Sequence, residues 1–203
     1  MDHAGRRAES INAVRQGRLI AGKIGAMIRL IGPGGAGKST IGALLADRLG
    51  VMFCDLDQHF TRRFGDISEY IGKLGYQAYA RENVETYCSL FRKPHQHGVV
   101  ALSSGFMTYA HDIHLAYRIV VHEIKQSPTT FVLLPSVDRE VCVAETVRRQ
   151  TARPFGGSAV KEEAVIRERF EIYMALPMRR FETMRSVTDA VDDLATASLN
   201  DAR

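Results

Sequence analysis

The stretch GPGGAGKST, residues 32–40, decides the fold that we expect for this chain of 203 residues. It matches the pattern G-x-x-x-x-G-K-[ST] through Gly32, Gly37, Lys38 and Ser39, and it joins a short apolar run to a predicted helix. Glycines let the backbone turn tightly and point its N–H groups inward, and the N-terminus of the helix adds positive partial charge. The stretch therefore predicts a phosphate-binding loop for a nucleoside triphosphate.

Each part of this loop has an expected role. Lys38 would bridge the β- and γ-phosphates, and the Ser39 hydroxyl would ligate Mg²⁺. The residues that we expect to bind the nucleotide are Gly34, Gly35, Ala36, Gly37, Lys38, Ser39 and Thr40.

Strand and helix patterns alternate along the rest of the chain. The expected strands are short apolar runs bounded by turn residues, at 26–32, 51–57, 98–105, 129–136 and 179–183. The expected helices lie at about 39–49, 67–92, 138–150, 161–174 and 187–197. In the first of these helices the expected apolar face consists of Ile41, Leu44, Leu45 and Leu49. The alternation predicts a three-layer α/β/α fold with a central, mostly parallel five-stranded sheet, which binds ligands at the carboxyl ends of its strands.

Composition excludes several classes of protein. With 45% hydrophobic and 25% charged residues the chain is typical of a globular protein, and we expect one domain over 26–203 after an N-terminal extension over 1–25. The net charge of +4 is mild and no basic run is interleaved with aromatics, so we expect no nucleic-acid surface. No apolar run is long enough for a secretory signal or a membrane span. Three widely spaced cysteines favour free thiols, and we expect a cytoplasmic monomer or weak homodimer.

Two carboxylates follow the second expected strand, in FCDLDQHF at 53–60. On an extended strand residues i and i+2 share a face, so Asp55 and Asp57 are expected to point to one site. The third and fourth strands end without the acidic residue that usually helps to organise magnesium, which makes this pair the obvious supply of acidic groups.

The phosphate-binding loop leaves three classes open: a mechanical or signalling NTPase, a nucleotide kinase, and a kinase that acts on a small molecule. The length of the chain argues against large motor assemblies, and the absence of an N-K-x-D motif disfavours a GTPase.

With these residues identified, the chain resembles the shikimate kinases, which are small P-loop phosphotransferases of the nucleoside-monophosphate-kinase type. The resemblance is strongest over 28–60, where strand, loop, helix and D-x-D follow one another with the family's spacing. It continues more loosely through the acceptor-binding segment at 65–85, the third-strand loop, the lid in RRQTARPFGG and the helix containing RERFEIY. The resemblance implies an ATP- and Mg²⁺-dependent kinase with a mobile lid at about 148–160.

The resemblance also implies roles for single residues. Asp55 would help to hold Mg²⁺, and Asp57 would bind the acceptor hydroxyl and act as its base. Arg153 would fold over the phosphates with the lid, assisted by Arg148 or Arg149. Arg169, four residues before Tyr173, would grip the carboxylate of the acceptor. On the acceptor side we also expect Gly105 and Arg81 to contact the substrate.

Two departures from the family lie on the acceptor side. The aromatic-arginine pair of the family here reads Tyr79-Ala80, with Arg81 one residue later, which is about 100° of rotation around the helix. The family's triple glycine after the third strand here reads Ser103-Ser104-Gly105. The expected acceptor is therefore shikimate or a related cyclitol, sugar or other polyhydroxy compound.

Two other functions stay open at this point. A non-enzymatic sensor with a kinase-like fold would bind ATP and a ligand and report them to a partner, which the two departures and the N-terminal extension would suit. A nucleoside-monophosphate kinase is disfavoured, because Asp55 and Asp57 would repel an anionic phosphate acceptor.

Overall fold

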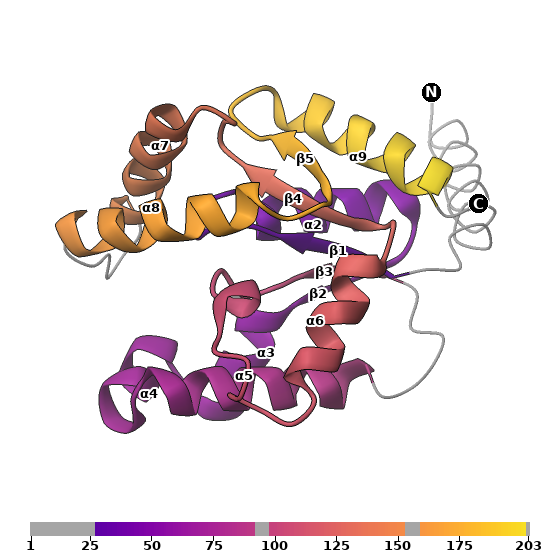
Figure 1. The fold of residues 1–203 in the computed structure, drawn as a ribbon. Coiled ribbons are helices and arrows are strands. Elements are labelled where there is room, and N and C mark those ends of the chain that lie inside the picture. The colour runs from indigo at the N-terminus through magenta and orange to yellow at the C-terminus, as the bar shows by residue number, and fades with distance from the viewer. Residues whose placement is uncertain (1–26, 92–97, 153–158, 202–203) are drawn as a thin grey trace, which may run out of the picture.

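The computed structural model describes residues 27–91, 98–152 and 159–201, and it has a five-stranded parallel sheet at its centre (Figure 1). The strands lie in the order β2-β3-β1-β4-β5, and every neighbouring pair is parallel. Their bounds are β1 Ile28–Ile31, β2 Met52–Asp55, β3 Gly98–Ala101, β4 Thr130–Leu134 and β5 Arg179–Glu182. The five expected strands are therefore confirmed, and the sheet is parallel throughout.

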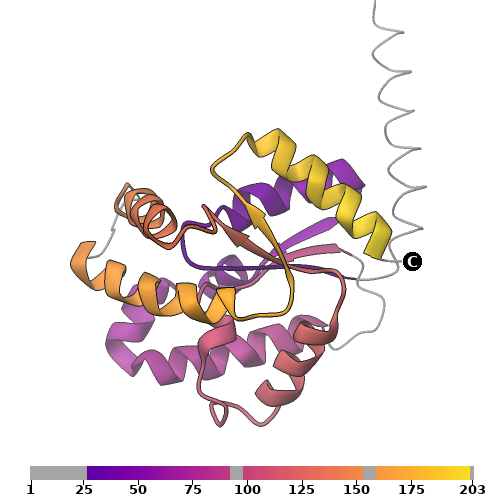
Figure 2. The same cartoon turned by 45° about the horizontal axis from the view of Figure 1, so that its top comes forward.

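Helices cover both faces of this sheet (Figure 2). The helices α2 and α9 lie side by side on one face, whereas α5, α6 and α8 cover the other. The helix bounds are α2 Lys38–Leu49, α3 Leu56–Phe64, α4 Ile67–Leu74, α5 Tyr76–Phe91, α6 Tyr117–Gln126, α7 Arg139–Thr151, α8 Ala159–Met174 and α9 Val187–Asp201, and a short 3₁₀ helix, η1, spans Phe106–Thr108. The three-layer α/β/α architecture is as expected. No described helix is long and apolar enough to cross a lipid bilayer.

The core consists of two apolar clusters, one on each side of the sheet. Along β4 the side chains alternate between them, with Phe131 and Leu133 packed toward α2 and α9, and Val132 and Leu134 packed toward the opposite helices. This alternation is the two-residue period of a strand, and a strand that is buried on both faces is apolar throughout. It explains why the sequence of each central strand is a short continuous apolar run.

The carboxyl ends of the parallel strands meet at one edge of the sheet. The phosphate-binding loop follows β1, the acidic pair follows β2, and the segment Ser103–Gly105 follows β3. Parallel pairing of β1 with β3 and of β3 with β2 brings these three segments together, because all three strands end on the same side.

The second strand is shorter than expected, and this corrects the argument for the acidic pair. It ends at Asp55, and α3 begins at the next residue. Asp55 is the N-cap of α3, since its carboxylate oxygen Oδ1 accepts a hydrogen bond from the backbone N–H of Gln58 at 3.1 Å. Asp57 therefore lies in the first turn of a helix, and the proposed common face of an extended strand does not exist.

The structure contains a helix, α6, that the sequence-based prediction lacks. Its buried side chains are Tyr117, Val120, Val121 and Ile124, which is the i, i+3, i+4, i+7 spacing of an amphipathic helix. The signal was thus present in the sequence. The buried face of α2 is narrower than predicted, because Leu44 is 46% exposed while Leu45 and Leu49 are buried.

Candidate active site

The phosphate-binding loop has the backbone of an anion cradle. Gly37 is the N-cap of α2 with a φ of 90°, and no side chain caps the helix or places an acidic group in its first turn. Gly32 has a φ of 144°, and a Cβ at this position would lie 2.1 Å from the carbonyl oxygen of Leu133. Only glycine fits these positions, because L side chains rarely adopt such φ values. The first N–H groups of α2 are left to bind an anion.

Lys38 lies close over this loop. Its side chain is buried, and its Nζ donates hydrogen bonds to the carbonyl oxygens of Gly32 at 2.7 Å and Pro33 at 2.9 Å. The ammonium group is therefore held beside the cradle, where it adds positive charge for a polyphosphate.

A cavity of about 390 Å³ contains the cradle and the acceptor-side residues together. From the phosphate-binding segment its lining includes Gly34, Gly35, Gly37, Lys38, Ser39 and Thr40. From the other segments its lining includes Asp55, Asp57, Ile67, Ser68, Ile71, Tyr76, Tyr79, Leu102, Ser104, Gly105, Gln150 and Arg169. Most of the expected site residues thus share one cavity, although they come from four separate parts of the chain.

The carboxylate of Asp57 accepts two hydrogen bonds from side-chain hydroxyls. Its Oδ1 accepts a hydrogen bond from the Ser103 hydroxyl at 2.5 Å and a longer one from the Tyr79 hydroxyl at 3.4 Å. Burial raises the pKa of Asp57, the hydrogen bond from Ser103 and the charge of Lys38 act against that rise, and the neighbouring charge of Asp55 adds to it. This partly buried carboxyl group therefore holds a proton more readily than an ordinary aspartate does.

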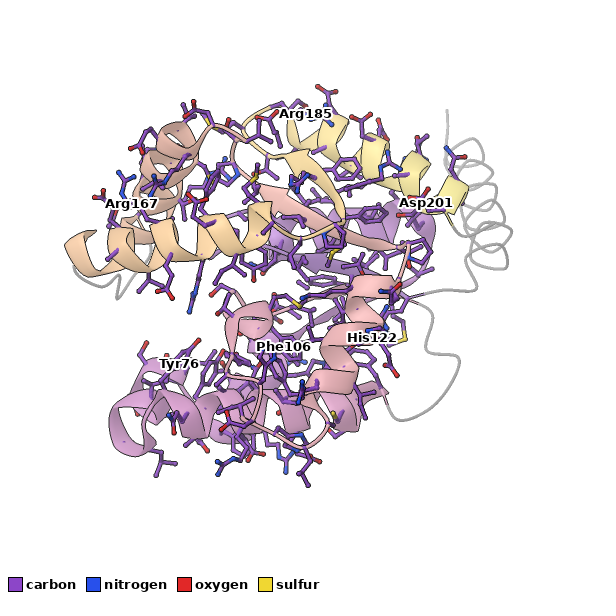
Figure 3. The ribbon with its side chains drawn as sticks, in the orientation of Figure 1. Tyr76, Phe106, His122, Arg167, Arg185 and Asp201 are labelled. Atoms are coloured by element: carbon purple, nitrogen blue, oxygen red, sulfur yellow. The ribbon has the colours of Figure 1, made fainter. Side chains whose placement is uncertain are left out.

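Arg169 reaches the cavity from α8. Its guanidinium donates to the Ser104 hydroxyl at 3.1 Å and to the Tyr76 hydroxyl at 3.2 Å, so it bridges the segment after β3 and the start of α5. Figure 3 shows Tyr76 at this end of α5, on the side that faces α8. Tyr173 donates to the Ser104 carbonyl at 2.9 Å and so fixes the same segment. A cation anchored in this way is suited to bind a carboxylate.

Some expected residues lie elsewhere. Arg81 is exposed on α5 and donates from Nε to the carbonyl oxygen of Ile113 at 3.2 Å, and it does not line the cavity. The physical reason is helix rotation, since Tyr79 of the same helix faces the site and two further residues turn the side chain away. This placement corrects the assignment of Arg81 to the substrate. Ala36 has a fully buried side chain in the core, so only its backbone is near the cradle. Arg153 lies outside the described residues.

Two residues at the start of the expected lid make contacts that the sequence did not predict. Gln150 lines the cavity and lies so close to the loop that a Cβ at Gly34 would be 2.3 Å from its Nε2. Arg149 donates from Nη1 to the carbonyl oxygen of Gly35 at 3.2 Å and from Nη2 to that of Thr183 at 3.1 Å. Arg149 therefore ties the phosphate-binding loop to the segment after β5. The run RRQ at 148–150, at the start of the expected lid, was the available signal.

Comparison with known proteins agrees with this geometry. The family model described as "Shikimate kinase" matches residues 34–197. A shikimate kinase of Thermobifida fusca is 32% identical over 178 residues, which cover 84% of this chain and 92% of that protein. A shikimate kinase of Colwellia psychrerythraea is 35% identical over 127 residues, covering 61% and 66% respectively.

Solved structures show the same fold. The shikimate kinase of Acinetobacter baumannii in complex with shikimate is 25% identical, with a TM-score of 0.56 over 84% of this chain and 88% of that one. The shikimate kinase of Aquifex aeolicus is 20% identical, with a TM-score of 0.64 over 85% and 95%. The likeness covers nearly all of the described residues, and the sensor alternative is not favoured. The chain therefore belongs to the shikimate kinase family and is an ATP-dependent phosphotransferase with a small-molecule alcohol acceptor.

Proposed function

We propose that this protein transfers the γ-phosphate of ATP to a hydroxyl of shikimate, with Asp57 as the base. The observation that carries the proposal is that one cavity contains the phosphate cradle, the partly buried carboxylate of Asp57 and the anchored guanidinium of Arg169. Shikimate carries both a carboxylate and ring hydroxyls, so it can engage Arg169 and Asp57 at the same time. The names of the relatives above support this choice of acceptor.

The reaction needs little covalent help from the protein. Asp57 accepts the proton of the acceptor hydroxyl, the hydroxyl oxygen bonds to the γ-phosphorus, and the bond from that phosphorus to the β–γ bridging oxygen breaks to release ADP. Lys38 and the N–H groups at the start of α2 offset the negative charge of the phosphates. The remaining task is to place the attacking oxygen in line with the bond that breaks.

The residues at the start of α2 and the end of β2 fit Mg²⁺. The exposed hydroxyl of Ser39 and the carboxylate of Asp55 both line the cavity, and both are oxygen donors of the kind that Mg²⁺ prefers. Oδ1 of Asp55 is taken by the N–H of Gln58, which leaves Oδ2 for the metal or its water. When bound, Mg²⁺ would neutralise charge on the phosphates.

The proposal extends to the lid and to the whole protein. Residues 153–158 of the lid expected at 148–160, Arg153 among them, lie outside the described residues, and by resemblance to the family we assign Arg153 to the phosphates. The chain would act in the cytoplasm, since its cysteines form no disulfide bond among the described residues. It would be a monomer or weak homodimer. Arg153→Ala should slow turnover without removing nucleotide binding. The oligomeric state is tested separately, by light scattering after gel filtration.

The acceptor is tested by a panel of shikimate, quinate, cyclitols, sugars and nucleoside monophosphates, with ADP release as the signal. We expect shikimate to give the highest kcat/KM, and we expect Asp57→Asn to remove turnover while ATP still binds by calorimetry. Faster turnover of another polyol would overturn the assignment of the acceptor. Full activity of Asp57→Asn would overturn the assignment of the base.

A further inference from the structure

Ser103 lies outside the cavity and contacts Asp57, which lines it. Its side chain is 1% exposed and does not line the cavity, yet its hydroxyl donates the 2.5 Å hydrogen bond to Oδ1 of Asp57. The next residue, Ser104, does line the cavity. Ser103 therefore cannot contact an acceptor directly, and any effect it has on the reaction passes through Asp57.

A second buried residue determines the direction of this hydrogen bond. Asn83 on α5 is fully buried, its Oδ1 accepts from the Tyr109 hydroxyl at 3.3 Å, and its Nδ2 donates to Oγ of Ser103 at 3.0 Å. Because the Ser103 oxygen accepts from Asn83, its single hydrogen is left for Asp57. Hydrogen bonds that follow one another in this way strengthen each other. The three hydrogen bonds form one chain of donors that runs from Tyr109 through Asn83 and Ser103 to the carboxylate of Asp57.

The two oxygens of the Asp57 carboxylate therefore differ in their hydrogen bonds. Both protein donors, Ser103 and Tyr79, bond to Oδ1. Among the described residues no hydrogen bond to Oδ2 is found, so Oδ2 is the oxygen available to a ligand in the cavity. The charged side chains that share the cavity with it are Lys38, Asp55 and Arg169.

We propose that Ser103, oriented by Asn83, is a positioning residue for phosphoryl transfer, because it holds Oδ1 of Asp57 and so presents Oδ2 to the acceptor hydroxyl. The inference rests on the proposed function in one respect, namely that Asp57 is the base. A merely structural role for the same residues would tie α5 to the segment after β3 without affecting the chemical step.

The two roles are separated by steady-state kinetics with ATP and acceptor varied in turn. For Ser103→Ala we expect kcat to fall by about tenfold or more, which corresponds to the loss of one hydrogen bond to a charged group, while KM for ATP changes by less than about twofold. Ser103→Thr keeps the hydroxyl and should recover most of the loss. The control is Ser89→Ala on α5, whose hydroxyl donates to the backbone carbonyl of Thr86 in its own helix and bonds to no other described residue, and its kcat should not change.

A double-mutant cycle gives a second readout that also works if Ser103→Thr does not fold. Asn83→Ala alone should lower kcat, but it should have almost no further effect in Ser103→Ala, because Asn83 acts through that hydroxyl. An unchanged kcat in folded Ser103→Ala, or losses of the two variants that multiply, would overturn the inference. An active Asp57→Asn variant would instead show that the base itself is wrongly assigned, so the two failures are distinguishable.

Discussion

Replacing Gly105 by alanine should damage the acceptor site while leaving the nucleotide site intact. Gly105 has φ −98° and ψ −4°, a backbone conformation that alanine adopts without strain. The effect of the substitution therefore comes only from the close contacts that the added Cβ would make. A Cβ at this position would lie 2.4 Å from the Tyr76 hydroxyl, 3.0 Å from Nη2 of Arg169 and 3.2 Å from Cε1 of Tyr109.

The magnitude follows from which atoms can move. Real Cβ contacts essentially never fall below 3.0 Å, so the Tyr76 hydroxyl must retreat, and its 3.2 Å hydrogen bond with Arg169 breaks. Arg169 then loses the support that aims it at the acceptor, and a hydrogen bond between the acceptor and a charged group is worth about 1.5–3 kcal/mol, which is about 10- to 150-fold in kcat/KM for the acceptor. Tyr76 is 42% exposed and its hydroxyl is at the end of a side chain. The free energy of unfolding should therefore change by less than about 1 kcal/mol.

Initial rates of ADP release measure this effect, first with acceptor varied at saturating ATP and then with ATP varied at saturating acceptor. Gly72→Ala is the matched control, because a Cβ at Gly72 in α4 would meet nothing within 4 Å. That control should keep wild-type kinetics and gain up to about 1 kcal/mol of stability. An unchanged kcat/KM for the acceptor in Gly105→Ala, or a larger change for ATP than for the acceptor, would refute the reasoning.

Three further predictions concern other parts of the fold. Arg149→Ala removes the tie to the Gly35 carbonyl, so calorimetry should show ATP binding weakened by about tenfold, and wild-type affinity would contradict this role. Gly42→Ala puts a Cβ 2.6 Å from the ring of Phe53, and overpacking of about 1–3 kcal/mol should lower Tm by several degrees despite better helix propensity. Burial, helped by the charge of Asp55, raises the pKa of the Cys54 thiol to about 11, so at pH 8 iodoacetamide should label it about 100-fold more slowly than a thiol of ordinary pKa. Peptide mass spectrometry measures that rate, and fast labelling would contradict the burial.

The elements that the sequence predicted correctly are those with a strong local signal. The central strands β1, β3 and β4 are short, mainly apolar runs, and α2 begins within the loop motif and ends at Leu49 with Gly50 as its C-cap. The helix α3 was missed because the expected strand was extended to Asp57, whereas the side chain of Asp55 caps the helix and ends the strand there. The helix α6 was missed although its spacing was readable.

The acidic pair shows that a correct location can rest on a wrong reason. Asp55 and Asp57 do reach one cavity, as expected. They do so because β2 ends and α3 begins between them, not because they share the face of a strand. Arg81 shows the reverse case, since its position in the sequence is close to the family pattern but its side chain is turned away from the site.

The sequence by itself determined the nucleotide half of this protein. A phosphate-binding loop is one continuous segment, whose glycines, lysine and helix start act within nine residues, 32–40, so its chemistry is local. The acceptor half was decided by the tertiary structure. Ser103 and Asp57 are 46 residues apart, Ser104 and Arg169 are 65 apart, and Tyr76 and Arg169 are 93 apart. Such contacts depend on which side of its helix or loop each residue faces after packing, and no spacing along the chain determines that.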